Sequence, residues 1–244
     1  MISFYLVLVA VISYLFGNIN WARIIAKSKN QDITKMGSGN PGTLNMSRNL
    51  GLKFGLLTFL LDVLKGVIPT LVAYLIFRNI TFENTNFIVS DLAIYVAGLF
   101  VVLGHIYPVF LKFKGGKGIA STIGVFTMCE CLHGFSWAVV VIMALIAAVL
   151  FIYFTEFGAM GSFIAITPPA ISGTIRLYLV YGASEIFAVE LFHAITNILI
   201  FAICFFTWFA HRKNIERMLA GEEHPTSIKS MVVKAKEKKL NKNK

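Results

Sequence analysis

Charged side chains are scarce in this chain of 244 residues, at 14% of the total, and acidic ones are the rarer kind, with 12 Asp and Glu against 22 Lys and Arg. Soluble domains carry about 25% charged residues. Hydrophobic residues reach 57% here, and the mean hydropathy is +0.75. The composition excludes an ordinary soluble domain and predicts an all-α, polytopic membrane bundle.

Cysteine is also rare. Cys129, Cys131 and Cys204 all lie in apolar sequence, without a second CxxC or a histidine at metal-ligand spacing. We therefore expect neither a disulfide nor a metal site.

The apolar stretch over residues 1–16 lacks a charged start and an A-x-A cleavage site, so we interpret it as a retained first span rather than a signal peptide.

Apolar runs predict seven membrane spans. They cover residues 2–22, 54–77, 91–111, 118–132, 134–154, 159–181 and 188–210. The fourth run has roughly 15 residues, which at 1.5 Å per residue falls short of the ~30 Å hydrocarbon core. We therefore expect a short span that begins inside a re-entrant loop.

Basic residues crowd the first connection, the third connection and the carboxyl-terminal tail. The positive-inside rule places all three in the cytoplasm. Seven crossings with an external amino terminus satisfy this placement, and six do not.

We expect one membrane domain over residues 1–225 and a flexible, basic cytoplasmic tail over 226–244, with attraction to anionic lipid as an alternative for the tail. Nucleic acid is not an expected partner.

Two glycine-rich, basic loops are the most informative motifs: G-S-G-N-P-G at residues 37–42 and K-G-G-K-G at residues 114–118. Glycine lets backbone N–H groups approach an anion, and nearby Lys or Arg neutralises its charge. The second loop runs into an apolar helix, whose N-terminus favours anions. It lacks Walker A spacing, so nucleotide hydrolysis is not indicated. An ordinary flexible turn is the alternative for the first loop.

Other polar residues lie within the apolar runs. Asp62 and Lys65 are three residues apart on one helical face, where each is costly in lipid without a partner, so we expect an ion pair that fixes the bundle. A direct role in binding or positioning the substrate is the alternative. A second pattern depends on the last span continuing unbroken to residue 214. In that case four polar side chains form one stripe facing the bundle interior, namely His193, Asn197, His211 and Asn214.

Three ordered motifs, G-S-G-N-P-G…N…R, G-H-I-Y-P-V-F-L-K-F-K-G-G-K-G-I-A-S and H-R-K-N-I-E-R-M-L-A-G-E-E, stand between these spans. Together with the Asp62/Lys65 pair and the topology, they resemble the bacterial membrane acyl-phosphate:glycerol-3-phosphate acyltransferase family over most of residues 1–225. The resemblance implies transfer of a fatty acyl group from acyl phosphate to the 1-hydroxyl of glycerol 3-phosphate. The products are lysophosphatidic acid and phosphate, in the first acylation of phospholipid synthesis.

The resemblance also implies site residues. The catalytic set is Ser38, Arg48, Lys117, His211 and Asn214. Substrate binding falls to Gly39, Asn40, Lys114, Gly115, Gly116, Gly118 and Ser162. Asp62, Lys65 and Glu223 give structural support. Ser162 is the one serine available where family members commonly carry several. The hydroxyl proton goes either to the donor's own phosphate or to His211.

The partners expected on this basis are the two phosphate substrates and membrane lipids. No cofactor and no protein partner are expected. The alternative function is a transporter of a phosphorylated solute, because broken helices and basic loops serve transporters equally well. A transporter predicts polar residues continuing through the external half of the bundle, whereas the motifs here gather on the cytoplasmic side.

Overall fold

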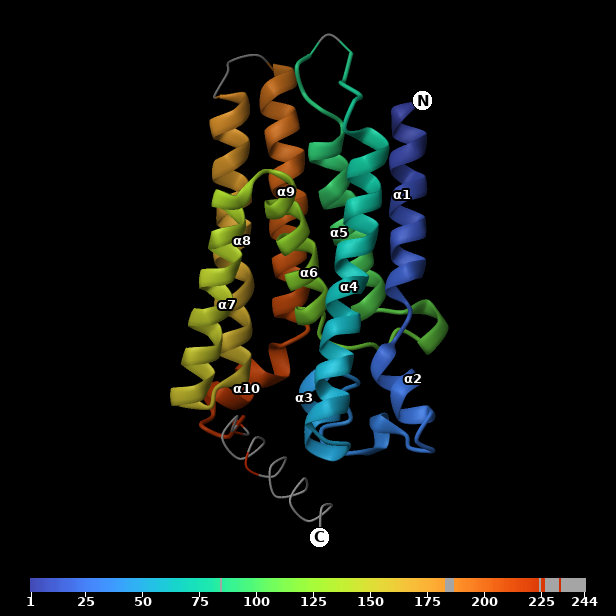
Figure 1. Cartoon of the computed structure of the whole chain (residues 1–244), viewed down its shortest axis with the longest axis vertical. Coiled ribbons are helices and arrows are strands. Elements are labelled where there is room, and N and C mark those ends of the chain that lie inside the picture. The colour runs from blue at the N-terminus through green and yellow to red at the C-terminus, as the bar shows by residue number, and fades with distance from the viewer. Residues whose placement is uncertain (84, 183–186, 224, 227–232, 234–244) are drawn as a thin grey trace.

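The structure is a computed structural model that describes all residues except 84, 183–186, 224, 227–232 and 234–244. The tail predicted over 226–244 therefore lies outside the described residues, apart from Thr226 and Val233. The described residues form an elongated helical bundle (Figure 1) without a β-strand; Thr81 and Ile88 make one isolated bridge. The α-helices are α1 (Ile2–Gly17), α2 (Trp21–Lys27), α3 (Thr43–Asn49), α4 (Leu52–Phe77), α5 (Ser90–Ile106), α6 (Ile119–Leu132), α7 (Phe135–Thr155), α8 (Gly158–Tyr181), α9 (Phe187–Phe209) and α10 (Arg212–Leu219).

Six described segments are long and apolar enough to cross a membrane, and α6, with 14 residues, is the short seventh apolar helix. The all-α membrane bundle is thus confirmed, including the short fourth span that follows a loop. The predicted span 2–22 is interrupted, because the chain leaves α1 at Asn18 and starts α2 after Asn20. The Asn20 side chain caps α2 by accepting the Arg23 backbone N–H at 2.9 Å.

Close helix packing fixes the short α6 against α4. A Cβ atom on Gly66 of α4 would lie 2.1 Å from the Ser121 carbonyl oxygen, and one on Gly124 of α6 would lie 2.1 Å from the Val63 carbonyl oxygen. Such glycines let two membrane helices approach backbone to backbone. The start of α6, which follows the second glycine-rich loop, is thereby held at a fixed depth beside α4.

The last predicted span does not run on to residue 214. Helix α9 ends at Phe209, His211 is the N-cap of α10, and α10 turns away from the axis of α9 (Figure 1). The continuous stripe of four polar residues is therefore wrong. His193 packs its ring against Tyr178 and Phe192 within the bundle, whereas His211 and Asn214 lie at the end of the molecule where α10 begins.

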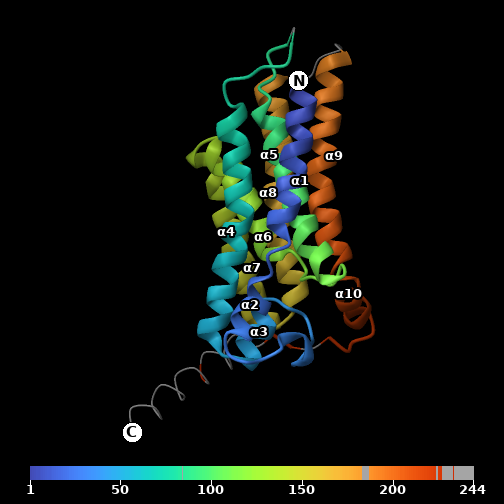
Figure 2. The same ribbon diagram turned by 90° about the vertical axis from the view of Figure 1, so that its right-hand side faces the viewer.

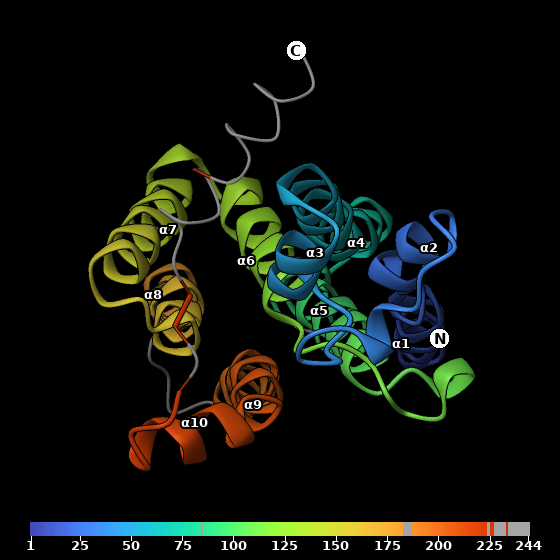
Figure 3. The same cartoon turned by 90° about the horizontal axis from the view of Figure 1, so that it is seen from below.

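The bundle has two unlike ends. The amino terminus, the end of α4, the start of α5, the end of α8 and the start of α9 lie at one end, and α2, α3 and α10 lie at the other (Figures 1 and 2). Viewed along the bundle, α7, α8 and α10 form one side, α1 to α5 form the other, and α6 lies between them (Figure 3). The three motifs thus gather at one end of the bundle.

Candidate active site

A cavity of about 940 Å³ opens between these two sides, at the end that carries α2, α3 and α10. Fourteen of the fifteen predicted site residues line it. They are Ser38, Gly39, Asn40, Arg48, Asp62, Lys114, Gly115, Gly116, Lys117, Gly118, Ser162, His211, Asn214 and Glu223. Lys65 is the exception and lies behind the cavity wall, paired with Asp62. The fold brings the predicted residues together, and their individual roles stay predictions.

The first glycine-rich loop is held by a side chain from α3. Asn45, which is 2% exposed, accepts the Ser38 N–H at 3.2 Å and donates to the Met36 and Ile33 carbonyls at 2.9 and 3.2 Å. Gly39 has φ +70°, in the left-handed region that favours glycine. The loop is therefore ordered as a turn by the Asn45 side chain.

The second loop folds back onto the end of α5. The N–H groups of Gly115 and Gly116 donate to the Ile106 and His105 carbonyls, each at 3.2 Å. A Cβ atom on Gly116 would lie 2.3 Å from Nε2 of His105, so this position requires glycine. Gly118, with φ +85°, then starts α6, and the positive end of the α6 dipole faces the cavity.

The predicted Asp62–Lys65 pair forms beneath this loop and includes a third residue. Lys65 Nζ lies 3.0 Å from Asp62 Oδ1, 2.8 Å from His105 Nδ1 and 2.7 Å from the Ile19 carbonyl oxygen. The three ammonium donors are thus all used. The group joins the α1–α2 break, α4 and α5 at the base of the cavity. His105 is a structural part of this group and touches the loop at Gly116.

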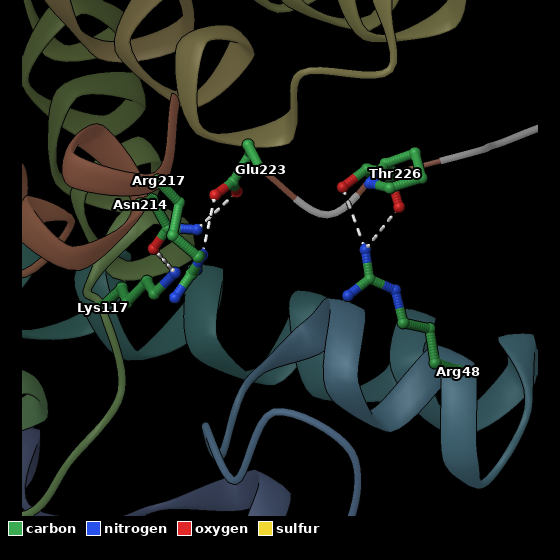
Figure 4. A network of polar contacts seen from close by, with 7 residues as sticks. Arg48, Lys117, Asn214, Arg217, Glu223 and Thr226 are labelled. Atoms are coloured by element: carbon green, nitrogen blue, oxygen red, sulfur yellow. Dashed lines mark hydrogen bonds and ion pairs between the residues drawn. The ribbon is translucent and has the colours of Figure 1, made fainter. Parts of the chain in front are cut away.

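The third motif supplies a linked chain of polar contacts (Figure 4). Lys117 Nζ donates to Asn214 Oδ1, and Asn214 Nδ2 donates to Glu223 Oε1 at 2.6 Å. Glu223 also accepts from Arg217 Nε at 3.1 Å. Glu223 therefore braces α10 against the second loop, the position predicted for it.

Arg48 reaches the segment that follows α10. Its Nη2 donates to Thr226 Oγ1 at 3.0 Å and to the Pro225 carbonyl at 3.3 Å (Figure 4). Thr226 is 4% exposed, and its N–H donates to the Glu156 carbonyl at 2.8 Å. These contacts join α3, the α7–α8 turn and the segment after α10 at one edge of the cavity.

Burial changes the acid–base character of two cavity residues. It lowers the pKa of Lys117 to about 8; the Glu223 carboxylate opposes this shift, and Arg217 and Arg48 add to it. Burial, and then the charge of Lys117, lower the pKa of His211 to about 4. His211 Nδ1 donates to the Thr207 carbonyl at 2.9 Å, because a carbonyl only accepts. Nε2 of the neutral ring is thus an acceptor.

The opposite wall of the cavity is apolar. It comes from α6, α7 and α8 and includes Ile123, Leu145, Ala148, Val149, Ile152, Ala159 and Ala165. Ser162 belongs to this wall, and its hydroxyl donates to the Gly158 carbonyl at 2.9 Å, within α8. The cavity therefore pairs a cationic, glycine-rich side with a hydrocarbon-like side.

Several cavity residues were missed from the sequence. Arg23 and Arg217 line the cavity, Asn45 orders the first loop, and Thr226 anchors Arg48. Arg217 lies inside the third motif, so the motif itself could have indicated Arg217 as a cavity residue. Arg23 and Thr226 give no local signal, because their contacts are made with segments more than 90 residues away.

The fold and this cavity define an integral membrane protein whose cavity is cationic and glycine-rich on one side and apolar on the other. Residues 7–221 match the family model described as glycerol-3-phosphate acyltransferase. The chain belongs to the glycerol-3-phosphate acyltransferase family.

Relatives and solved structures agree with this family. The glycerol-3-phosphate acyltransferase of Thermoanaerobacter sp. strain X514 is 36% identical over 233 residues, which cover 93% of this chain and 99% of that protein. The Aquifex aeolicus strain VF5 relative is 34% identical over 228 residues, covering 88% and 95%. The crystal structure of PlsY, an integral membrane glycerol 3-phosphate acyltransferase in its glycerol 3-phosphate form, matches with a TM-score of 0.69 and 32% identity, over 91% of this chain and 95% of that one.

Proposed function

We propose that this acyltransferase uses acyl phosphate as the donor and the 1-hydroxyl of glycerol 3-phosphate as the acceptor, and releases lysophosphatidic acid and phosphate. The observation that carries the proposal is the two-sided cavity, in which two glycine-rich loops and several cations face an apolar wall. Both substrates carry phosphate, and one carries a fatty chain. A related enzyme with a TM-score of 0.68 to this chain was solved in its lysophosphatidic acid form, which supports the proposed product.

The proposed reaction is a direct transfer. The hydroxyl oxygen of glycerol 3-phosphate attacks the acyl carbonyl carbon, the bond from that carbon to the phosphate oxygen breaks, and phosphate leaves. An acyl phosphate is already activated, so the protein mainly aligns the two reactants and stabilises developing negative charge. Lys117, Arg48 and the N–H groups of the first turn of α6 supply that charge stabilisation.

The proton of the attacking hydroxyl goes to the donor's phosphate in this proposal. His211 is the other candidate, but a ring whose pKa is lowered to about 4 is a weak base at neutral pH. Its Nε2 is an acceptor, since Nδ1 donates to Thr207, and it is suited to orienting the hydroxyl. Asn214, held by Lys117 and Glu223, is placed beside it.

We further propose that the cavity faces the cytoplasm of a bacterial cell and that the amino terminus is external. Arg23, Lys27 and Lys53 surround the cavity end of the bundle, whereas Arg78 stands at the other end together with Asp91. The excess of basic residues at the cavity end supports this orientation. Cysteine-accessibility labelling at Lys112 and Arg78 in intact cells tests it, and labelling of Lys112→Cys from outside would reverse it.

The test of the reaction uses the purified full chain in detergent or lipid, with acyl phosphate and glycerol 3-phosphate and without added metal. We expect release of phosphate and stoichiometric lysophosphatidic acid, detected by mass spectrometry. Absence of turnover in a folded preparation would remove the proposed reaction. Acyl-CoA should not replace acyl phosphate; equal use of both donors would retain the acyltransferase and reject the proposed donor.

A further inference from the structure

Arg23 is a cation of the cavity that the three motifs do not contain. It lies in the first turn of α2, lines the cavity together with Thr34, Ser38 and Gly39, and is partly buried. Its Nη2 donates to the Lys114 carbonyl at 3.2 Å. Arg23 thus touches the second glycine-rich loop while it stands beside the first.

The guanidinium of Arg23 still has donors to offer. The bond from Nη2 to Lys114 is its one hydrogen bond among the described residues, Nε is buried behind the cavity surface, and no described carboxylate lies within 4 Å of the group. A guanidinium carries five N–H donors, so the Nη donors of Arg23 that face the cavity are open to a ligand. Guanidinium groups bind phosphate through two parallel N–H bonds.

The position of Arg23 distinguishes between the two substrates. Helix α2 packs against η1 (Ile33–Lys35), α3 and α4, and it lies across the molecule from α7 and α8 (Figure 3). The apolar wall of the cavity comes from α6, α7 and α8. A fatty chain must lie along that wall, so the chain-free substrate is left with the polar side.

We propose that Arg23 binds the phosphate of glycerol 3-phosphate and sets the affinity for this substrate. The proposal rests on the reaction proposed above. Arg23 joins Lys114 at the polar side of the cavity, while Lys117, Asn214 and His211 stand closer to α10. It is a substrate-binding residue and takes no proton.

The test compares Arg23→Ala, Arg23→Lys and a control, Lys27→Ala, in full-chain protein. We expect Arg23→Ala to raise the KM for glycerol 3-phosphate roughly 10-fold or more, the usual effect of losing a charge-assisted bond. The KM for acyl phosphate and kcat should change by less than about 3-fold on the same grounds. Arg23→Lys should recover part of the affinity, because lysine keeps the positive charge but lacks the two parallel N–H donors of a guanidinium. Lys27 is exposed on the same helix, and its removal should change neither KM.

A different pattern would overturn the proposal. If Arg23 only holds the Lys114 carbonyl, Arg23→Ala disturbs the whole loop and changes both KM values and kcat together. Unchanged kinetics in Arg23→Ala would also reject it, while wild-type turnover would leave the proposed reaction intact. Failure of the wild type to turn over rejects the reaction itself. If Arg23→Ala does not fold, Arg23→Gln provides the same comparison, and the shift of the unfolding midpoint by glycerol 3-phosphate measures binding directly.

Discussion

The bundle contains two polar regions, one at each end, and they use their charges differently. At the cavity end, Lys117 and Arg48 donate to neutral oxygens of Asn214, Thr226 and Pro225 and keep their charge available to the cavity. At the other end, Asp91 accepts from the Tyr181 hydroxyl at 2.5 Å, and its other oxygen lies 2.9 Å from His133 Nε2. In the second region Asp91, Tyr181 and His133 thus bond to one another, whereas the nitrogens of Arg176 and the carboxylate oxygens of Glu130 are buried without a hydrogen-bond partner among the described residues.

The second region also contains deeply buried charges. Glu130 and Arg176 are 0% and 1% exposed, and Asp91 is 5% exposed. Tyr95 and Glu130 lie against Gly173, one turn of α8 before Arg176, and the charges of Asp91 and Glu130 act on the guanidinium. None of these residues lines the described cavity. A transporter would need the two regions to form one path, so their separation favours an enzyme.

Replacing Arg176 by Met should give the largest effect on stability. The change leaves Asp91 and Glu130 buried without the opposing charge of Arg176, and removing one partner of a set of buried charges costs about 3–5 kcal/mol. Thermal unfolding in detergent measures this loss. Arg78→Met is the matched control, because Arg78 is exposed at the end of α4 and should cost less than about 0.5 kcal/mol. An unchanged midpoint for Arg176→Met would show that the cluster contributes nothing to stability.

Replacing Lys117 by Ala should show the opposite behaviour. Loss of one preorganised charge donor lowers kcat/KM by about 10²-fold or more, which is roughly 2.7 kcal/mol. The unfolding midpoint should stay near that of the wild type, because Lys117 donates to one neutral oxygen. Lys112→Ala, an exposed cation of the same loop, is the control. Near-normal activity of Lys117→Ala would remove its proposed role.

The two regions also differ in how far the sequence predicted them. The cavity end was predicted well, because its glycine-rich loops and cations lie in compact motifs. Asp62 and Lys65 were paired correctly, since three residues in a helix fix their geometry. The Glu130–Arg176 cluster was missed, because each appears as a lone charge in an apolar helix and a single sequence does not show which helices face each other.

Helix breaks account for the remaining errors. The α1–α2 and α9–α10 breaks lie within runs of apolar and polar residues that contain neither proline nor a decisive glycine, at residues 18–20 and 210–211. A tertiary contact lies at each break. Lys65 binds the Ile19 carbonyl at the first, and Lys117 binds Asn214 in α10 just after the second, where His211 also makes a local bond to the Thr207 carbonyl. Hydrophobic periodicity alone could not locate these two breaks. The first break determines where Arg23 lies, in the first turn of α2, and the second determines where His211 lies, at the N-cap of α10.

The smallest expected effect is a pH dependence that belongs to the cavity end alone. Burial lowers the pKa of Lys117 to about 8, so the ammonium is present at neutral pH and is lost as the pH rises past this value. Phosphate monoesters have their second pKa near 6 and do not titrate there. We therefore expect kcat/KM to fall above pH 8, by roughly 10-fold at pH 9.

Lys117→Arg separates this cause from general alkaline damage. A guanidinium keeps its charge throughout this range, so the variant should lose the fall above pH 8 even if its overall rate is lower. In the wild type, the pH profile of kcat should begin to fall at a higher pH than that of kcat/KM, because a bound phosphate stabilises the ammonium. A fall that persists unchanged in Lys117→Arg would assign the titration to another group and remove Lys117 as its source.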